Sequence, residues 1–125
     1  MSARLLLLDD DPAIVAVLTR YFAARGFEVE ACHDARAALA RVEAAEDFDA
    51  VICDLHFSPA RLAEGLQIVE RARKRRPAAA VLLFTGAGEA ALRDAALRLG
   101  AHEVLSKPAP LASLHDALRR AMKAP

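Results

Sequence analysis

Short apolar runs alternate with longer stretches of helical periodicity along this chain. Leu5–Leu8 and Ala50–Cys53 are apolar throughout, a pattern typical of strands buried on both faces of a parallel sheet. Another run, Phe27–His33, alternates apolar positions with Glu28 and Glu30. The predicted strands are Arg4–Asp9, Phe27–His33, Ala50–Cys53, Ala80–Phe84 and Glu103–Leu105.

Each predicted strand is followed by a segment with helical spacing. Asp11 is a suitable N-cap, Pro12 suits the first helical position, and Gly26 is a typical C-terminal stop. Asp34 is expected to cap the second helix in the same way. The predicted helices are Pro12 to Gly26, Asp34 to about Ala45, Leu66 to Pro77, Glu89–Leu99 and Leu111–Met122, with a loop from Leu55 to about Ala63.

Five successive strand–helix units predict an α/β fold. We expect a five-stranded parallel sheet with five helices on both faces, joined by right-handed crossovers. The 125 residues suffice for one domain, and we expect a single domain spanning 1–125 without an output domain. The composition, 55% hydrophobic and 27% charged, is that of a globular protein rather than a disordered one.

The net charge and the two cysteines limit which partners and which cellular location we expect. The formal net charge is zero, so the chain as a whole has no electrostatic attraction to nucleic acid or to a membrane. No apolar run approaches the roughly 20 residues of a membrane span. Cys32 and Cys53 fall in predicted buried strands without metal-ligand spacing. We therefore expect free core thiols and a cytoplasmic protein.

Polar side chains appear where the predicted strands stop. The first strand ends at Asp9 and Asp10, the third at Asp54, the fourth at Thr85 and the fifth at Lys107. In a parallel sheet these ends share one edge, where ligands bind. Carboxylate oxygens suit Mg²⁺, and a carboxylate can also attack phosphorus. Phosphoryl transfer needs in-line positioning and positive charge, so the set fits transfer of a phosphoryl group onto an aspartate.

The chain resembles the receiver domain of two-component response regulators over essentially its whole length. The matching motifs are Asp9-Asp10-Asp11-Pro12, Val51-Ile52-Cys53-Asp54-Leu55, Leu83-Phe84-Thr85-Gly86, Gly100-Ala101 and Leu105-Ser106-Lys107-Pro108. The resemblance implies a flavodoxin-like doubly wound (βα)5 three-layer sandwich.

The resemblance also implies a role for each matching residue. Asp54 would accept the phosphoryl group, with Asp9, Asp10, Asp54 and the backbone carbonyl of His56 holding Mg²⁺ or Mn²⁺. Thr85, Gly86 and Lys107 would bind the phosphate and switch on activation, and a cis peptide bond would precede Pro108. The implied partners are a sensor histidine kinase or histidine phosphotransferase and an unidentified downstream protein. The latter would bind the surface of the fourth helix, fifth strand and fifth helix.

Three departures from the family pattern affect these expectations. The span from Asp54 to Gly65 is longer than is usual in the family, so we expect the loop Ser58–Glu64 beside the site to be atypical. Val104 replaces the aromatic residue that normally couples to the hydroxyl residue. His56 and Ala87 occupy positions that tune access of attacking water.

Two other functions remain in view. A degenerate receiver would serve as a phosphorylation-independent interaction module. A haloacid-dehalogenase-like phosphatase would use Asp9 as nucleophile in an Asp-x-Asp motif, although Pro12 stands where that family has glycine.

The basic run Arg71–Arg76 is interpreted as a solvated face at a helix C-terminus. We expect no direct nucleic-acid or membrane binding, no enzymatic activity beyond the chain's own phosphorylation and dephosphorylation, and a monomer or weak phosphorylation-dependent dimer.

Overall fold

The predicted five-stranded parallel sheet is present. The structure is a computed structural model that describes residues 3–44, 48–55, 59–85 and 90–123. All pairings are parallel and the strand order is β2-β1-β3-β4-β5. The strands are β1 (Ala3–Leu8), β2 (Phe27–Cys32), β3 (Ala50–Leu55), β4 (Ala80–Thr85) and β5 (Glu103–Ser106).

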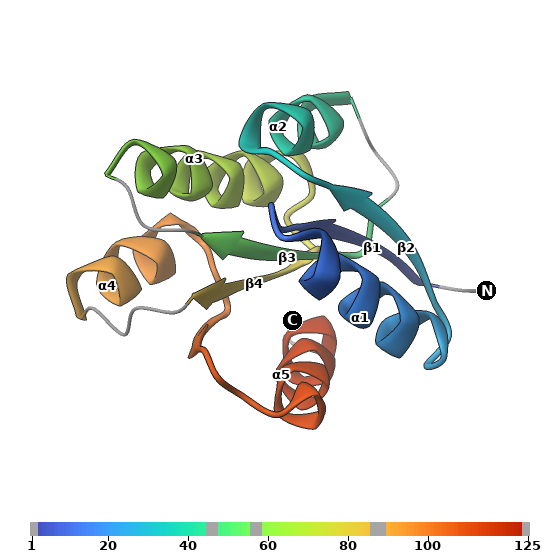
Figure 1. Ribbon diagram of the computed structural model, residues 1–125. Helices are drawn as coiled ribbons and strands as arrows, with labels where there is room; N and C mark the ends of the chain where they lie inside the picture. Colours follow the sequence, from blue (N-terminus) through green and yellow to red (C-terminus); the bar gives the residue numbers. More distant parts are fainter. Residues whose placement is uncertain (1–2, 45–47, 56–58, 86–89, 124–125) are drawn as a thin grey trace.

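Helices cover both faces of the sheet and give a three-layer sandwich (Figure 1). Helices α2, α3 and α4 contribute side chains to the core on one face, and α1 and α5 to the core on the other. This is the doubly wound arrangement expected from the sequence. The helices are α1 (Pro12–Ala23), α2 (Ala35–Ala44), α3 (Pro59–Arg75), α4 (Ala90–Leu99) and α5 (Leu111–Lys123).

Alternation along the strands sends side chains to two separate cores. In β1, Leu6 and Leu8 face α2 and α3, whereas Leu5 and Leu7 face α1 and α5. Because successive residues of a strand point to opposite faces, a strand buried on both faces must be apolar at every position. This requirement explains the uninterrupted apolar runs of the sequence.

The two predicted N-caps are confirmed. The Asp11 side chain accepts a hydrogen bond from the Ala13 amide at 2.9 Å. The Asp34 side chain accepts one from the Ala37 amide at 2.7 Å. Each carboxylate satisfies an amide that the first helical turn leaves without a partner.

The predicted start of the third helix is wrong. A loop was expected to run to about Ala63, yet β3 continues through Leu55 and α3 begins at Pro59. Proline is favourable at the first position of a helix, where its missing amide proton costs nothing. Alanine, arginine, leucine and glutamate, which follow Pro59, are good helix formers. The expected atypical loop therefore belongs to the helix from Pro59 onward, and residues 56–58 lie outside the described part.

The basic run at the end of α3 has partners within the chain. Arg71 pairs with Glu43 at 3.3 Å, and Arg76 with Asp49 at 3.7 Å. Lys74 lies 3.9 Å from a carboxylate one helical turn earlier. These contacts agree with the interpretation of this run as a solvated face. Within the described ranges, no helix has both the length and the apolar character needed to cross a membrane.

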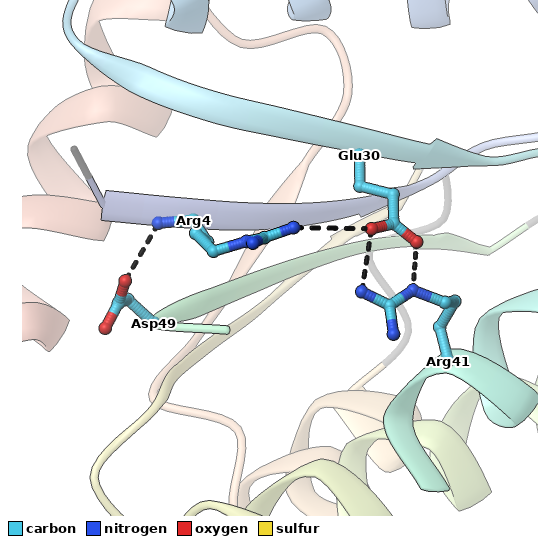
Figure 2. Close-up of polar contacts among 4 residues, drawn as sticks. All are labelled: Arg4, Glu30, Arg41 and Asp49. Atoms are coloured by element: carbon cyan, nitrogen blue, oxygen red, sulfur yellow. Dashed lines mark hydrogen bonds and ion pairs between the residues drawn. The ribbon is translucent and has the colours of Figure 1, made fainter. Parts of the chain in front are cut away.

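A polar cluster of Arg4, Glu30, Arg41 and Asp49 lies beside β1 (Figure 2). Arg41 forms a two-pronged contact with Glu30, with Nη2 and Oε1 2.7 Å apart, and this contact lowers the pKa of Glu30. The backbone amide of Arg4 donates to Asp49 Oδ2 at 2.8 Å. A cavity of about 490 Å³ opens beside this cluster, between β1, β2 and Arg41 of α2.

Candidate functional site

Asp9 and Asp54 are buried at the carboxyl edge of the sheet. Asp9 follows β1 directly and its side chain is 0% exposed, while Asp54 lies on β3 and is 5% exposed. Asp9 Oδ1 accepts a hydrogen bond from the Asp11 amide at 2.9 Å. The Asp9 amide in turn donates to the Cys32 carbonyl at 3.2 Å. Asp10, the third carboxylate of the expected set, is exposed.

Lys107 brings its ammonium group to both buried carboxylates. Its Nζ contacts Asp54 Oδ2 directly and lies 3.6 Å from Asp9 Oδ2. The backbone amide of Lys107 donates to the Thr85 carbonyl at 2.6 Å, which joins the end of β5 to the end of β4. The peptide bond between Lys107 and Pro108 is cis. The site thus gathers residues that are far apart in the sequence around one positive charge.

Burial and charge determine the protonation of Asp54. Removal from water, together with the neighbouring Asp9 carboxylate, raises the pKa of Asp54 to about 8, although Lys107 opposes both effects. Two buried carboxylates with one ammonium leave an excess of negative potential. That excess favours binding of another cation or uptake of a proton at Asp54.

The structure describes some of the other expected site residues and not others. Thr85 is the last residue of β4 and is fully buried. Val104 is buried in the core shared by α2, α3 and α4. Gly86, Ala87 and His56 lie outside the described residues, so their expected roles stay predictions.

Phe84 is a neighbour of the site that the sequence reasoning did not single out. It is the register partner of Asp54 across β3 and β4. The Lys107 ammonium lies 5.2 Å from the centroid of its ring. The only sequence signal was its position immediately before Thr85. Its pairing with Asp54 follows from the strand register, which sequence patterns do not give.

An apolar groove adjoins Lys107 on the α1 side of the sheet. Its volume is about 370 Å³, and we call it the α1 groove. Val17 in its wall is 53% exposed. The lining residues are Ala13, Ile14, Val17 and Leu18 of α1, with Phe84, Lys107, Pro108, Ala109 and Leu111.

The donor atoms at the edge suit a hard divalent cation. Mg²⁺ prefers oxygen ligands, takes one or two protein carboxylates and keeps several waters. Asp9, Asp10 and Asp54 supply such carboxylates, and the excess negative charge around Asp54 would be relieved by a cation. In the described ranges, no three His, Cys, Asp or Glu side chains already form a metal-binding cluster. Lys107 contacts Asp54 with its ammonium group.

Comparison with known proteins gives the class of this domain. Residues 5–119 match the family model of the response regulator receiver domain, and the chain belongs to that family. It is a receiver domain of the two-component type, as the sequence motifs indicated.

Two curated relatives illustrate the family. The photosynthetic apparatus regulatory protein RegA of Rhodobacter capsulatus is 40% identical over 114 residues, which cover 91% of this chain and 60% of that protein. The transcriptional regulatory protein TcrA of Mycobacterium tuberculosis is 34% identical over 118 residues, which cover 94% of this chain and 45% of that protein. The chain therefore spans about half the length of these two relatives.

Solved structures support the same assignment. A CheY-like response regulator receiver domain protein from Methanospirillum hungatei superposes with a TM-score of 0.87 at 26% identity, covering 98% of this chain and 94% of that one. A response regulator from Burkholderia pseudomallei, solved with a phosphorylated aspartic acid, a calcium ion and citrate, gives a TM-score of 0.82 at 27% identity. That match covers 99% of this chain and 76% of the other.

Proposed function

We propose that Asp54 accepts a phosphoryl group from a phosphohistidine of a sensor kinase or histidine phosphotransferase. The observation that carries the proposal is the burial of Asp54 beside Asp9, with the Lys107 ammonium on its carboxylate. The presence of a phosphorylated aspartic acid in the Burkholderia pseudomallei relative supports it. Family members interact with a sensor kinase and with downstream effectors, and this chain would do the same.

The chemistry requires an ionised Asp54. One carboxylate oxygen attacks phosphorus, the bond from phosphorus to the donor's imidazole nitrogen breaks, and that nitrogen keeps the bonding electron pair. Asp9, Asp10, Asp54 and the His56 carbonyl would hold Mg²⁺, which supplies positive charge beside the transferred oxygens. Lys107 follows the phosphoryl group as an ion-pair partner, and Thr85 provides a hydroxyl for a phosphate oxygen.

Incubation with Mg²⁺ and a small phosphodonor such as acetyl phosphate tests this proposal. The wild-type protein is expected to gain one phosphoryl group in a linkage that survives acid and is cleaved by hydroxylamine, as an acyl phosphate should be. Asp54→Ala should remain unmodified, and Asp116→Ala, which removes an exposed carboxylate on α5, should be modified normally. An adduct on the Asp54→Ala protein would contradict the proposal.

The same experiment decides between the alternatives. A wild-type protein that takes up no phosphoryl group, yet binds a partner, would be a degenerate interaction module. Phosphatase turnover lost in Asp9→Asn would instead favour the haloacid-dehalogenase-like interpretation. The structure gives that interpretation little support, because the second aspartate of its motif, Asp11, is occupied as the N-cap of α1.

We place the phosphodonor protein on the α1 groove, because this apolar surface opens beside Lys107. Val17→Glu should therefore slow phosphotransfer from a phosphorylated histidine partner by about tenfold or more, since a buried unpaired charge costs several kcal/mol at an interface. Phosphorylation by acetyl phosphate should be unaffected. Leu97→Glu on α4, which also replaces an exposed apolar side chain, serves as the control, and equal slowing by both variants would argue against the groove.

The output surface is proposed on α4, β5 and α5. Exposed apolar side chains, Leu97 on α4 and Met122 on α5, lie on these elements. An ion pair between Arg120 and Glu103, with Nη2 and Oε1 2.9 Å apart, ties α5 to β5. A partner that reads the phosphorylated state would contact these side chains.

A further inference from the structure

We propose that Phe84 is a positioning residue that holds Lys107 against Asp54. The aromatic ring would support the lysine side chain where it crosses β4, and so keep the ammonium at the carboxylate. This inference deepens the proposed function and rests on Asp54 being the phosphoacceptor.

The strand order makes such support necessary. Asp54 lies on β3 and Lys107 follows β5, with β4 between them. Two interstrand spacings separate these backbones, about 9.5 Å. The Lys107 side chain must therefore span the neighbouring strand to reach Asp54.

Phe84 occupies the place that the lysine crosses. It is the register partner of Asp54 on one side and of Leu105 on the other. Register partners in a parallel sheet direct their side chains to the same face. Lys107 follows the end of β5 and lies on that face as well, since it lines the α1 groove together with Phe84. The ring of Phe84 therefore lies between the backbone of Lys107 and the carboxylate of Asp54.

The contact has the geometry of a cation–π interaction. Nζ of Lys107 lies 5.2 Å from the ring centroid, within the roughly 6 Å over which the ring quadrupole attracts a cation. The ring is only 6% exposed and packs in the core of α1 and α5. A ring fixed in this way gives the flexible lysine a rigid surface, whereas an aliphatic side chain offers none of this attraction.

Phe84 also shapes the part of the α1 groove that borders the lysine. Phe84, Lys107 and Pro108 all line that groove. A smaller side chain at position 84 would enlarge the groove beside the lysine and leave the lysine side chain without support there. The distance between Lys107 and Asp54 would then vary.

Proton NMR of the metal-free protein tests the positioning directly. The Lys107 ε-methylene protons are expected to be shifted upfield by the ring in the wild type and in Phe84→Tyr, and to lose this shift in Phe84→Leu. Phe84→Met, which keeps more volume without a ring, replaces the leucine variant if that one does not fold. Leu82→Val shortens a core side chain on the same strand and face, and should leave the shift unchanged.

The rate of phosphorylation provides the second measurement. At saturating acetyl phosphate and Mg²⁺, Phe84→Leu should be about three- to tenfold slower, the size of one cation–π contact. Phe84→Tyr and Leu82→Val should match the wild type. In a Lys107→Ala background, Phe84→Leu should cause no further slowing, because its effect passes through the lysine.

Two results would overturn the proposal. One is an unchanged Lys107 ε-proton shift in Phe84→Leu. The other is equal slowing by Phe84→Leu with and without Lys107, which would make Phe84 a core residue only. Absence of phosphorylation in the wild type would count against Asp54 as phosphoacceptor, whereas the NMR shifts would still decide the position of Lys107.

Discussion

Replacing Asp54 with asparagine is expected to stabilise the folded protein, and to do so more strongly at about pH 8 than at about pH 5. Burial and the Asp9 carboxylate raise the pKa of Asp54 to about 8 in the folded chain. In the unfolded chain an aspartate ionises near its ordinary value of about 3.9. The wild-type protein is therefore destabilised by its buried carboxylate whenever the pH exceeds the pKa of Asp54 in the unfolded chain.

The direction of this pH dependence follows from proton linkage. Between the two pKa values the folded state binds more protons than the unfolded state, so the free energy of unfolding falls as pH rises. The stability that protonated Asp54 contributes is fully present below about pH 4, and it is lost as the pH rises to about 8, where Asp54 ionises in the folded state. The asparagine side chain of the Asp54→Asn variant does not titrate. The variant should therefore be more stable than the wild type at about pH 8 by a margin on the order of 3 kcal/mol.

Urea unfolding in the presence of a chelator measures this difference without interference from bound cations. Asp10→Asn is the matched control, since it removes one carboxylate from the same edge of the sheet at an exposed position. Its effect on the free energy of unfolding should be small, about 0.5 kcal/mol or less. An Asp54→Asn stabilisation that is equal at both pH values would show that Asp54 is not protonated through burial.

The sequence predicts most of the architecture because the sheet is buried on both faces. The central strands had to be short apolar runs, and two of the helices begin at an identifiable cap, Asp11 or Asp34. The start of α3 was misjudged because proline is compatible both with a loop and with the first turn of a helix. Only the contacts of the neighbouring segments choose between these two uses of Pro59.

The site was predictable to the extent that it depends on strand ends. Asp9, Asp54, Thr85 and Lys107 follow apolar runs, and the sheet collects them at one edge. What the sequence does not contain is the register that places Phe84 opposite Asp54. It also does not reveal that one lysine contacts Asp54 and lies within 3.6 Å of Asp9. Both depend on the relative shift of strands that are distant in the chain.

The junction between α4 and β5 depends on the absence of a side chain at position 100. Gly100 has φ of +117°, and a Cβ atom there would lie 2.4 Å from Cγ of Arg73. Arg73 has little freedom to withdraw, because its Nη1 donates to the Pro77 carbonyl at 2.7 Å and to the Ala79 carbonyl at 3.1 Å. A methyl group at position 100 must therefore disturb the chain between α3 and β4.

Gly100→Ala is expected to lower the free energy of unfolding by about 2–4 kcal/mol. Roughly 1 kcal/mol comes from the positive φ, and the rest from the hydrogen bonds that Arg73 gives up to carbonyl groups. Gly26→Ala is the matched control. Its φ is +93°, but nothing lies within 4 Å of the added methyl group. It should cost about 1 kcal/mol from backbone strain alone.

Measuring Gly100→Ala in an Arg73→Ala background separates the cost of backbone strain at position 100 from the cost of the steric clash with Arg73. Without the arginine side chain, the methyl group of Gly100→Ala has no Cγ to meet, and its cost should fall to that of Gly26→Ala. Thermal or urea unfolding of the two single variants and the double variant gives the coupling energy between positions 73 and 100. A cost of Gly100→Ala that is the same with and without Arg73 would assign the whole effect to the backbone conformation and none to packing of α3 against the α4–β5 junction.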